Sequence, residues 1–131
     1  MRWQRSAAEE RGSAVVDFVL VMVVLIPLVL GIVQTGLVLH VRNTLTAAAS
    51  DGARAGAPLG AGPDDAARRA RELITTALAD GFADDVTARE TIVDGISVIE
   101  VVVRARVPAL GLFGPAVELK VDGHAVKEVV A

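Results

Sequence analysis

The stretch RGSAVVDFVLVMVVLIPLVLG, residues 11–31, decides how this chain is organised. From Phe18 to Val33 every residue is apolar, glycine or proline, and residues 37–39 extend the run after a short polar interruption. Residues 18–39 are long enough to span a bilayer, since a helix needs about 20 residues to cross about 30 Å of hydrocarbon. The apolar core of a cleavable secretory signal is shorter, about 7 to 15 residues. We therefore predict a membrane-spanning helix.

Positive charge is distributed unequally around this run. Arg2, Arg5 and Arg11 precede it, whereas Arg42 is the only Arg or Lys within the ten residues after it. The positive-inside rule places the more basic flank in the cytoplasm. We therefore predict a cytoplasmic N-terminus and an exported C-terminal domain.

Three residues inside the run affect its geometry. Pro27 cannot donate to the carbonyl of Val23, so a kink is expected there, although membrane helices also tolerate proline without functional reason. Gly31 and Gly36 allow another helix to approach closely, but they are not spaced as GxxxG. The run therefore predicts no specific dimer motif.

Composition excludes several classes of function. The chain of 131 residues has a net charge of −3 and is mildly acidic after residue 40, so it lacks the basic footprint of a nucleic-acid-binding protein. It has no cysteine, and hence no disulfide framework or thiolate metal site. It has no tyrosine and one tryptophan, Trp3, which argues against stacking platforms for bases.

The residues of a catalytic or cofactor site do not assemble in this sequence. His40 and His124 are the only histidines, and His124 with Asp122 supplies only two candidate metal ligands. Residues 60–62, Gly-Ala-Gly, lack the lysine and the strand–helix context of a phosphate loop. No serine has a plausible His and Asp arrangement nearby. We expect no catalysis, no metal, no cofactor and no small-molecule substrate.

A charged residue stands at the start of the apolar run. Asp17 follows Gly12 by five residues, and the simplest interpretation is that it marks the membrane boundary. The order Gly12, Ser13, Asp17 and then a long apolar helix resembles the processing site of type IV prepilins. In that family a membrane peptidase cuts after the glycine, and an acid stands at the fifth mature position. The resemblance implies cleavage between Gly12 and Ser13, and pairing of Asp17 with the Ser13 ammonium of a neighbouring subunit.

The segment after the run adds a second resemblance. Residues 31–56 read GIVQTGLVLHVRNTLTAAASDGARAG and end on the core Gly52-Ala53-Arg54-Ala55. Together with RGSAVVDF, this segment resembles the TadE-like family of the tight-adherence (Tad) pilus systems over residues 11–57. Two positions depart from the family: Asp17 stands where Glu is usual, and Gln34 where an acid is frequent.

The TadE-like resemblance implies a structural role. It indicates a pseudopilin or minor pilin of a bacterial Tad pilus or related secretion system, held in the inner membrane. Its implied partners are a prepilin peptidase, other Tad pilins, the inner-membrane assembly platform and membrane lipid.

Periodicity predicts two helices. The first continues from Ser13 to about Gly56, roughly 65 Å at 1.5 Å per residue, and residues 57–63 then break it. The second opens at Asp64-Asp65, where acids favour the positive end of a helix. Its expected inner face comprises Ala66, Ala70, Leu73, Ile74, Ala77 and Leu78.

Strands follow the second helix. Residues 87–93 and 96–107 flank Asp94-Gly95, a strong hairpin signal. The alternating parity of the second strand breaks near Val98-Ile99, which predicts a bulge there. Residues 108–115 form a loop, and residues 117–130 form the last strand, in which Asp122-Gly123 is either a turn or an irregularity in a long strand. We predict an antiparallel sheet of three or four strands with the helices on one face.

These expectations define an α+β, type IV pilin-like fold. Its expected parts are a cytoplasmic leader (1–12), a transmembrane and extended helix (13–57) and an exported α+β domain (58–131). Two alternatives stay open. One is an unprocessed, single-pass membrane tether whose exported domain binds an extracellular ligand; the other is a secreted protein cut near Ala49.

Overall fold

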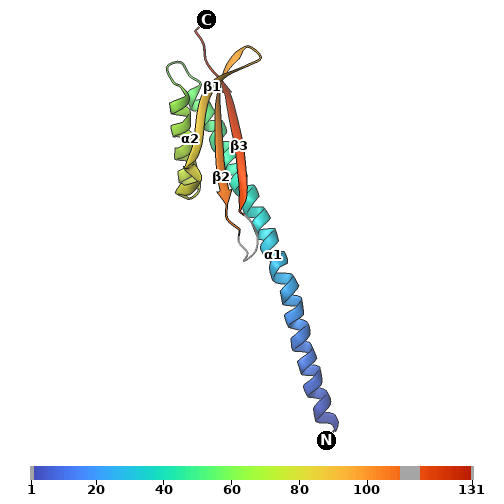
Figure 1. The fold of residues 1–131 in the computed structure, drawn as a ribbon. Coiled ribbons are helices and arrows are strands. Elements are labelled where there is room, and N and C mark those ends of the chain that lie inside the picture. Colours follow the sequence, from blue (N-terminus) through green and yellow to red (C-terminus); the bar gives the residue numbers. More distant parts are fainter. Residues whose placement is uncertain (1, 110–115, 131) are drawn as a thin grey trace.

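A computed structural model describes the backbone of residues 2–109 and 116–130, and within these ranges the side chains from Ala7 onward. It has an α+β fold in which a long helix carries a small domain at one end (Figure 1). The elements are α1 (Arg2–Gly56), α2 (Pro63–Ala77), a short 3-10 helix η1 (Asp80–Ala83), β1 (Asp85–Val93), β2 (Ile96–Val107) and β3 (Val117–Val126).

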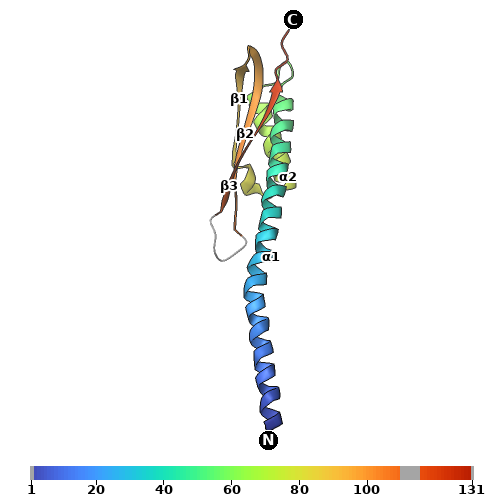
Figure 2. The same cartoon turned by 90° about the vertical axis from the view of Figure 1, so that its right-hand side faces the viewer.

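Helix α1 is longer than the sequence predicted. It begins at Arg2 instead of Ser13, because residues 2–11 are mostly Arg, Gln, Ala and Glu, which favour helix. Its 55 residues correspond to about 82 Å. The helix runs through Pro27 without a break, and Figures 1 and 2 show a gently curved rod. Of the two possibilities for Pro27, tolerance within a continuous helix describes the structure.

The break between the two helices is confirmed, with one correction. Pro63 does not belong to the breaker: it is the first residue of α2, where its fixed φ suits a helical turn and its missing N–H is not needed. Gly62 precedes it in an extended conformation, and its backbone N–H donates to Asp65 Oδ2 at 3.0 Å. Arg68 also donates to Asp65, and these two hydrogen bonds lower the pKa of that carboxyl, the one from Arg68 more strongly.

The sheet has three antiparallel strands in the order β1-β2-β3 within the described residues. Asp94 and Gly95 both have positive φ, 52° and 80°, as a tight hairpin turn requires. The predicted bulge near Val98-Ile99 is wrong, because both ladders keep an unbroken register through these residues. Val98 is buried on the outer face of the sheet, where Thr91 and Val126 flank it in register.

Strand β3 ends earlier than predicted. It pairs with β2 from Val117 to Val126 and then leaves the sheet, so residues 127–130 are not strand. Gly123 lies inside the ladder opposite Val101, so the alternative of a turn there is wrong. Residues 110–115 of the predicted loop lie outside the described residues.

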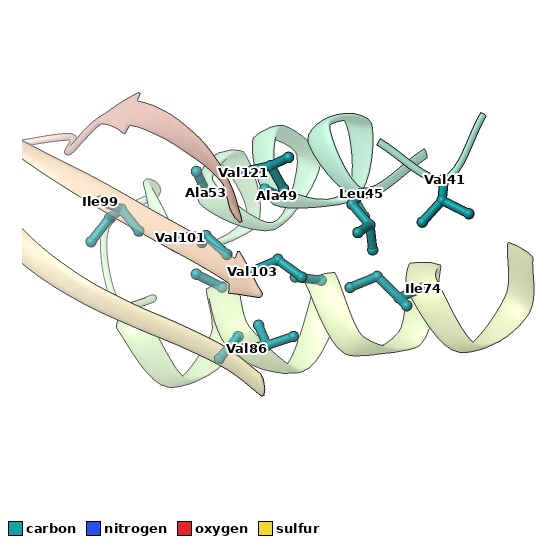
Figure 3. Packing of buried hydrophobic residues seen from close by; sticks show 14 of the residues in the cluster. Val41, Leu45, Ala49, Ala53, Ile74, Val86, Ile99, Val101, Val103 and Val121 are labelled. Atoms are coloured by element: carbon teal, nitrogen blue, oxygen red, sulfur yellow. The ribbon is translucent and has the colours of Figure 1, made fainter. Parts of the chain in front are cut away.

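Both helices cover one face of the sheet, as expected (Figure 2). Side chains from both helices and all three strands meet in one hydrophobic core (Figure 3). The helical contribution is dominated by alanine, which lets the backbones come close. The most completely buried large side chains are Leu45, Ile74, Ile99, Val41, Val101, Val103 and Val107.

The inner face of α2 differs in part from the predicted one. Ala66, Ala70 and Ile74 are buried as expected. Ala77 is exposed because the helix ends at this residue, and Ala67 is buried although it was not predicted.

Candidate functional site

The N-terminal half of α1 extends away from the domain. From Ala7 to Val33 every side chain except Met22 is exposed, with Phe18 61% and Val24 69% exposed to solvent. Such a bare apolar surface is unstable in water over this length. The helix is long and apolar enough to cross a membrane, and this indicates membrane anchoring.

The predicted processing site lies in the N-terminal part of this exposed segment, away from the domain. Gly12, Ser13 and Asp17 are all exposed on α1, and a Cβ added to Gly12 would meet nothing within 4 Å. Asp17 forms no hydrogen bond or ion pair with any residue that the structure describes. Asp17 lies four positions after Ser13, about 6 Å along the helix axis. The carboxylate therefore stands one turn above the peptide bond that a prepilin peptidase would cut.

The glycines of the apolar run leave open surface. A Cβ at Gly31 or Gly36 would meet nothing within 4 Å, so both positions offer a flat patch to another helix. The side chain of Thr35 donates to the Gly31 carbonyl at 2.9 Å, which satisfies its hydroxyl within the helix. Gln34 Nε2 donates to the Pro108 carbonyl at 3.1 Å, and this bond ties the helix to the end of β2.

The Gly52-Ala53-Arg54-Ala55 motif lies where α1 contacts α2. A Cβ at Gly52 would lie 2.7 Å from the Ala66 carbonyl oxygen, and Ala53 is completely buried. Arg54 points outward and forms an exposed ion pair with Asp51 at 3.6 Å. Ala55 is half-buried. The motif therefore has a packing role: its small residues let the two helices touch.

A second close approach was not predicted. A Cβ at Gly123 would lie 2.4 Å from the Ser50 nitrogen and 2.5 Å from the Ala49 carbonyl carbon. Helix α1 therefore crosses β3 backbone to backbone at this point. The sequence signal was the glycine itself, which we had interpreted as either a turn or an irregularity in a long strand.

The chain after β3 closes over the end of α1. The Lys127 ammonium donates to the carbonyls of Gly56 and Pro58 at 3.1 and 3.2 Å, and also to that of Ala61. The next residue, Glu128, donates its backbone N–H to the Ala57 carbonyl at 2.8 Å. A cation at the C-terminal end of a helix also complements the helix dipole. We call Lys127 and its three carbonyl partners the Lys127 clamp.

Ionic side chains cross the outer face of the sheet in register. Glu100 accepts from Arg89 and lies 3.4 Å from His124 Nε2, while His124 Nδ1 lies 3.3 Å from Asp122. The hydrogen bond from Arg89 is the main cause that lowers the pKa of Glu100. Among the described residues no group of three or more His, Asp or Glu side chains is arranged to hold a metal ion. This row is therefore best explained as cross-strand pairing.

Comparisons with known proteins bear on the helical part of the chain. The family model described as TadE-like protein matches residues 12–54 of the 131. No curated protein and no solved structure matches the chain. The matched segment begins at the predicted processing glycine and ends within the small-residue motif. The resemblance is thus confirmed over residues 12–54, where the chain is similar to the TadE-like family.

Proposed function

We propose that this protein is a pseudopilin or minor pilin that takes part in assembling a bacterial Tad pilus or a related secretion system. The TadE-like match suggests involvement in Tad pilus assembly. The observation that carries the proposal is the bare apolar part of α1, which continues without a break into the domain. Such a helix serves first as a membrane anchor and then as a packing surface for other subunits.

The expected orientation follows the charges around α1. The basic residues that precede the apolar segment stay in the cytoplasm, and the α+β domain lies on the extracytoplasmic side of the inner membrane. The peptidase would cut after Gly12, which is exposed on the helix. The role is structural and needs no catalytic group.

Asp17 has a defined task in this proposal. A carboxylate in lipid is unfavourable unless it finds a partner, and in a cleaved subunit the Ser13 ammonium stands only one turn away. On an incoming subunit, the corresponding Ser13 ammonium is the partner that Asp17 would bind. Pairing between the two would recruit subunits one after another without any contact between exported domains.

Processing is tested by the intact mass and first residue of the protein taken from its native membrane. A chain that begins at Ser13 supports the proposal. A chain that begins at Met1 favours the alternative, a membrane-tethered binding module.

The Asp17 charge is tested in cells that carry the chain as the sole copy. Asp17→Asn should lower piliation severely while leaving membrane insertion intact, because only the charge is lost. The matched control is Asp94→Asn at the hairpin, since both replace an exposed acid by its amide and Asn tolerates the positive φ of that position. Normal pili in the Asp17 variant, or in a clean deletion strain, would contradict the proposal.

A further inference from the structure

One end of the sheet lies alongside the last turn of the apolar run of α1. The hydrogen bond from Gln34 to the Pro108 carbonyl fixes the end of β2 at the level of residue 34. Leu37 and Val38 pack against the hydrophobic core of the domain. The last turn of the apolar run therefore belongs to the domain as well as to the predicted membrane segment.

This overlap shortens the part of α1 that is free to enter lipid. Between Asp17 and Gln34 the unpacked apolar residues are 18–33, and they measure about 24 Å along the helix. The hydrocarbon layer of a typical bilayer is about 30 Å thick. The helix cannot cross the hydrocarbon with this segment alone.

In a bilayer of this thickness the difference is made up between two limiting placements. The hydrocarbon can extend upward to Leu39, which carries the adjoining end of the sheet into it. The hydrocarbon can instead extend downward to Ala14, which leaves Asp17 about 5 Å inside it. The upper boundary of the hydrocarbon then lies at Val33. The headgroup layer adds about 5 to 7 Å on each side. In both placements the level of Pro108 lies within the headgroup layer or below it.

The residues at this end of the domain suit such a position. Pro108, Ala109, Ala116 and Val117 are apolar and exposed or half-buried, and Leu39, five residues after Gln34 on α1, is 54% exposed. We call these five residues the membrane-proximal rim. Charge returns immediately above it, where Arg106 and Glu118 form an ion pair at 2.6 Å on the outer face of the sheet.

We infer that the membrane-proximal rim rests in the headgroup layer of the same bilayer that holds α1. The rim is continuous with the membrane helix through the Gln34–Pro108 bond, and this continuity selects lipid over another protein as its partner. The contact is a second attachment of the domain to the membrane. It rests on insertion of α1 and is independent of any role in a pilus.

The inference is tested with single cysteines in the full chain, which has none of its own. Ala109→Cys and Val117→Cys place a polarity-sensitive NBD label on the rim. Val93→Cys is the matched control, because it makes the same exchange on the outer face of an edge strand at the far end of the sheet. Val33→Cys marks the helix itself. Each variant is reconstituted at less than one chain per vesicle in phosphatidylcholine with phosphatidylglycerol.

Two quenchers then report the depth of each label. Lipids that carry a nitroxide near the headgroup should quench the labels at 109 and 117 several times more strongly than the label at 93. Iodide in the water should show the opposite order. A blue-shifted emission at 109 and 117 relative to 93 is also expected, because the headgroup layer is less polar than water.

Other results would overturn the inference. If iodide reaches positions 109 and 117 as readily as position 93, the rim stands in water. If neither quencher reaches them, the protein itself covers the rim, since other chains are absent at this density. A label at 33 that lipid nitroxides fail to quench would show that α1 does not insert. None of these quenching measurements depends on piliation. A result against the membrane contact of the rim is therefore distinguishable from a result against the proposed function.

Discussion

Gly123→Ala should strongly destabilise the α+β domain. The new Cβ would lie 2.4 Å from the Ser50 nitrogen and 2.5 Å from the Ala49 carbonyl carbon, whereas non-bonded carbon atoms sit best at about 3.5 to 4.0 Å. These two contacts, and a third at 2.7 Å to the Ala49 carbonyl oxygen, are all with backbone atoms of α1, so no flexible side chain can turn away. Helix α1 and β3 must therefore separate by about 1 Å, a gap that forfeits a quarter to a half of each dispersion contact.

The cost follows from this separation. Overpacking a core by one methyl group typically costs about 1 to 3 kcal/mol, and the rigid backbone places this site at the upper end. A loss of about 2 to 3 kcal/mol in a domain of about 90 residues lowers Tm by about 10 to 20 °C. The assay is thermal unfolding of the full chain in detergent, followed by circular dichroism. Tryptophan fluorescence is unsuitable because the single tryptophan, Trp3, precedes the apolar run.

Gly81→Ala is the matched control for this prediction. It adds the same methyl group at an exposed position where nothing lies within 4 Å, so its Tm should stay close to that of the unmodified chain. If Gly123→Ala also keeps its Tm within a few degrees, the backbone contact between α1 and β3 does not exist as described. The packing argument for the whole domain would then fail.

Two further variants test the polar contacts of the domain. Lys127→Met removes the cation that joins the chain after β3 to the Gly56 carbonyl, and it should lower the free energy of unfolding by about 1 to 2 kcal/mol. The control is Lys120→Met, because Lys120 is exposed and has no hydrogen bond or ion pair among the described residues. It should lower the free energy much less in the same melting experiment. Glu100→Gln should lower Tm at pH 7 but should flatten its fall in acid. The reason is that the hydrogen bond from Arg89 lowers the pKa of Glu100, so its stabilisation is present above the unfolded pKa, near 4.5, and is lost as pH falls through the folded value. Equal slopes of Tm between pH 5 and pH 3 in the two chains would refute that assignment.

Periodicity predicted the elements that bury one continuous face. Periodicity extended the first predicted helix to about Gly56, and the structure explains it by one buried face that includes Val41, Leu45 and Ala49. The alternating parity of the second predicted strand identified β2, and its inward-facing Val101 and Val103 are completely buried. In both cases a single partner surface sets the pattern, so the sequence alone carries the information.

The sequence predictions were wrong or incomplete where a residue's environment is set by a partner that is distant in the sequence. Gly123 was ambiguous because Asp-Gly also suits a turn, whereas its real constraint is the approach of Ala49 and Ser50. The bulge was predicted from the parity of Val98, which is buried on the outer face by its strand neighbours without any irregularity. Lys127 gave no local signal, since its partners lie some 70 residues earlier in the sequence.

The membrane segment shows the same limitation in a quantitative form. Hydropathy counts apolar residues but not their partners, so residues 18–39 seemed sufficient to span the bilayer without help. In the structure Leu37 and Val38 already pack against the domain, and the free apolar length above Asp17 is about 24 Å. The position of the Asp17 charge and the height of the domain are therefore coupled through one rigid helix. Raising the domain out of the headgroup layer draws Asp17 further into hydrocarbon, where an unpaired charge costs about 2.5 to 3.5 kcal/mol at the centre. Under the proposed function, a subunit that leaves the membrane in this direction needs a cation beside Asp17, and the ammonium of a processed neighbour would supply it.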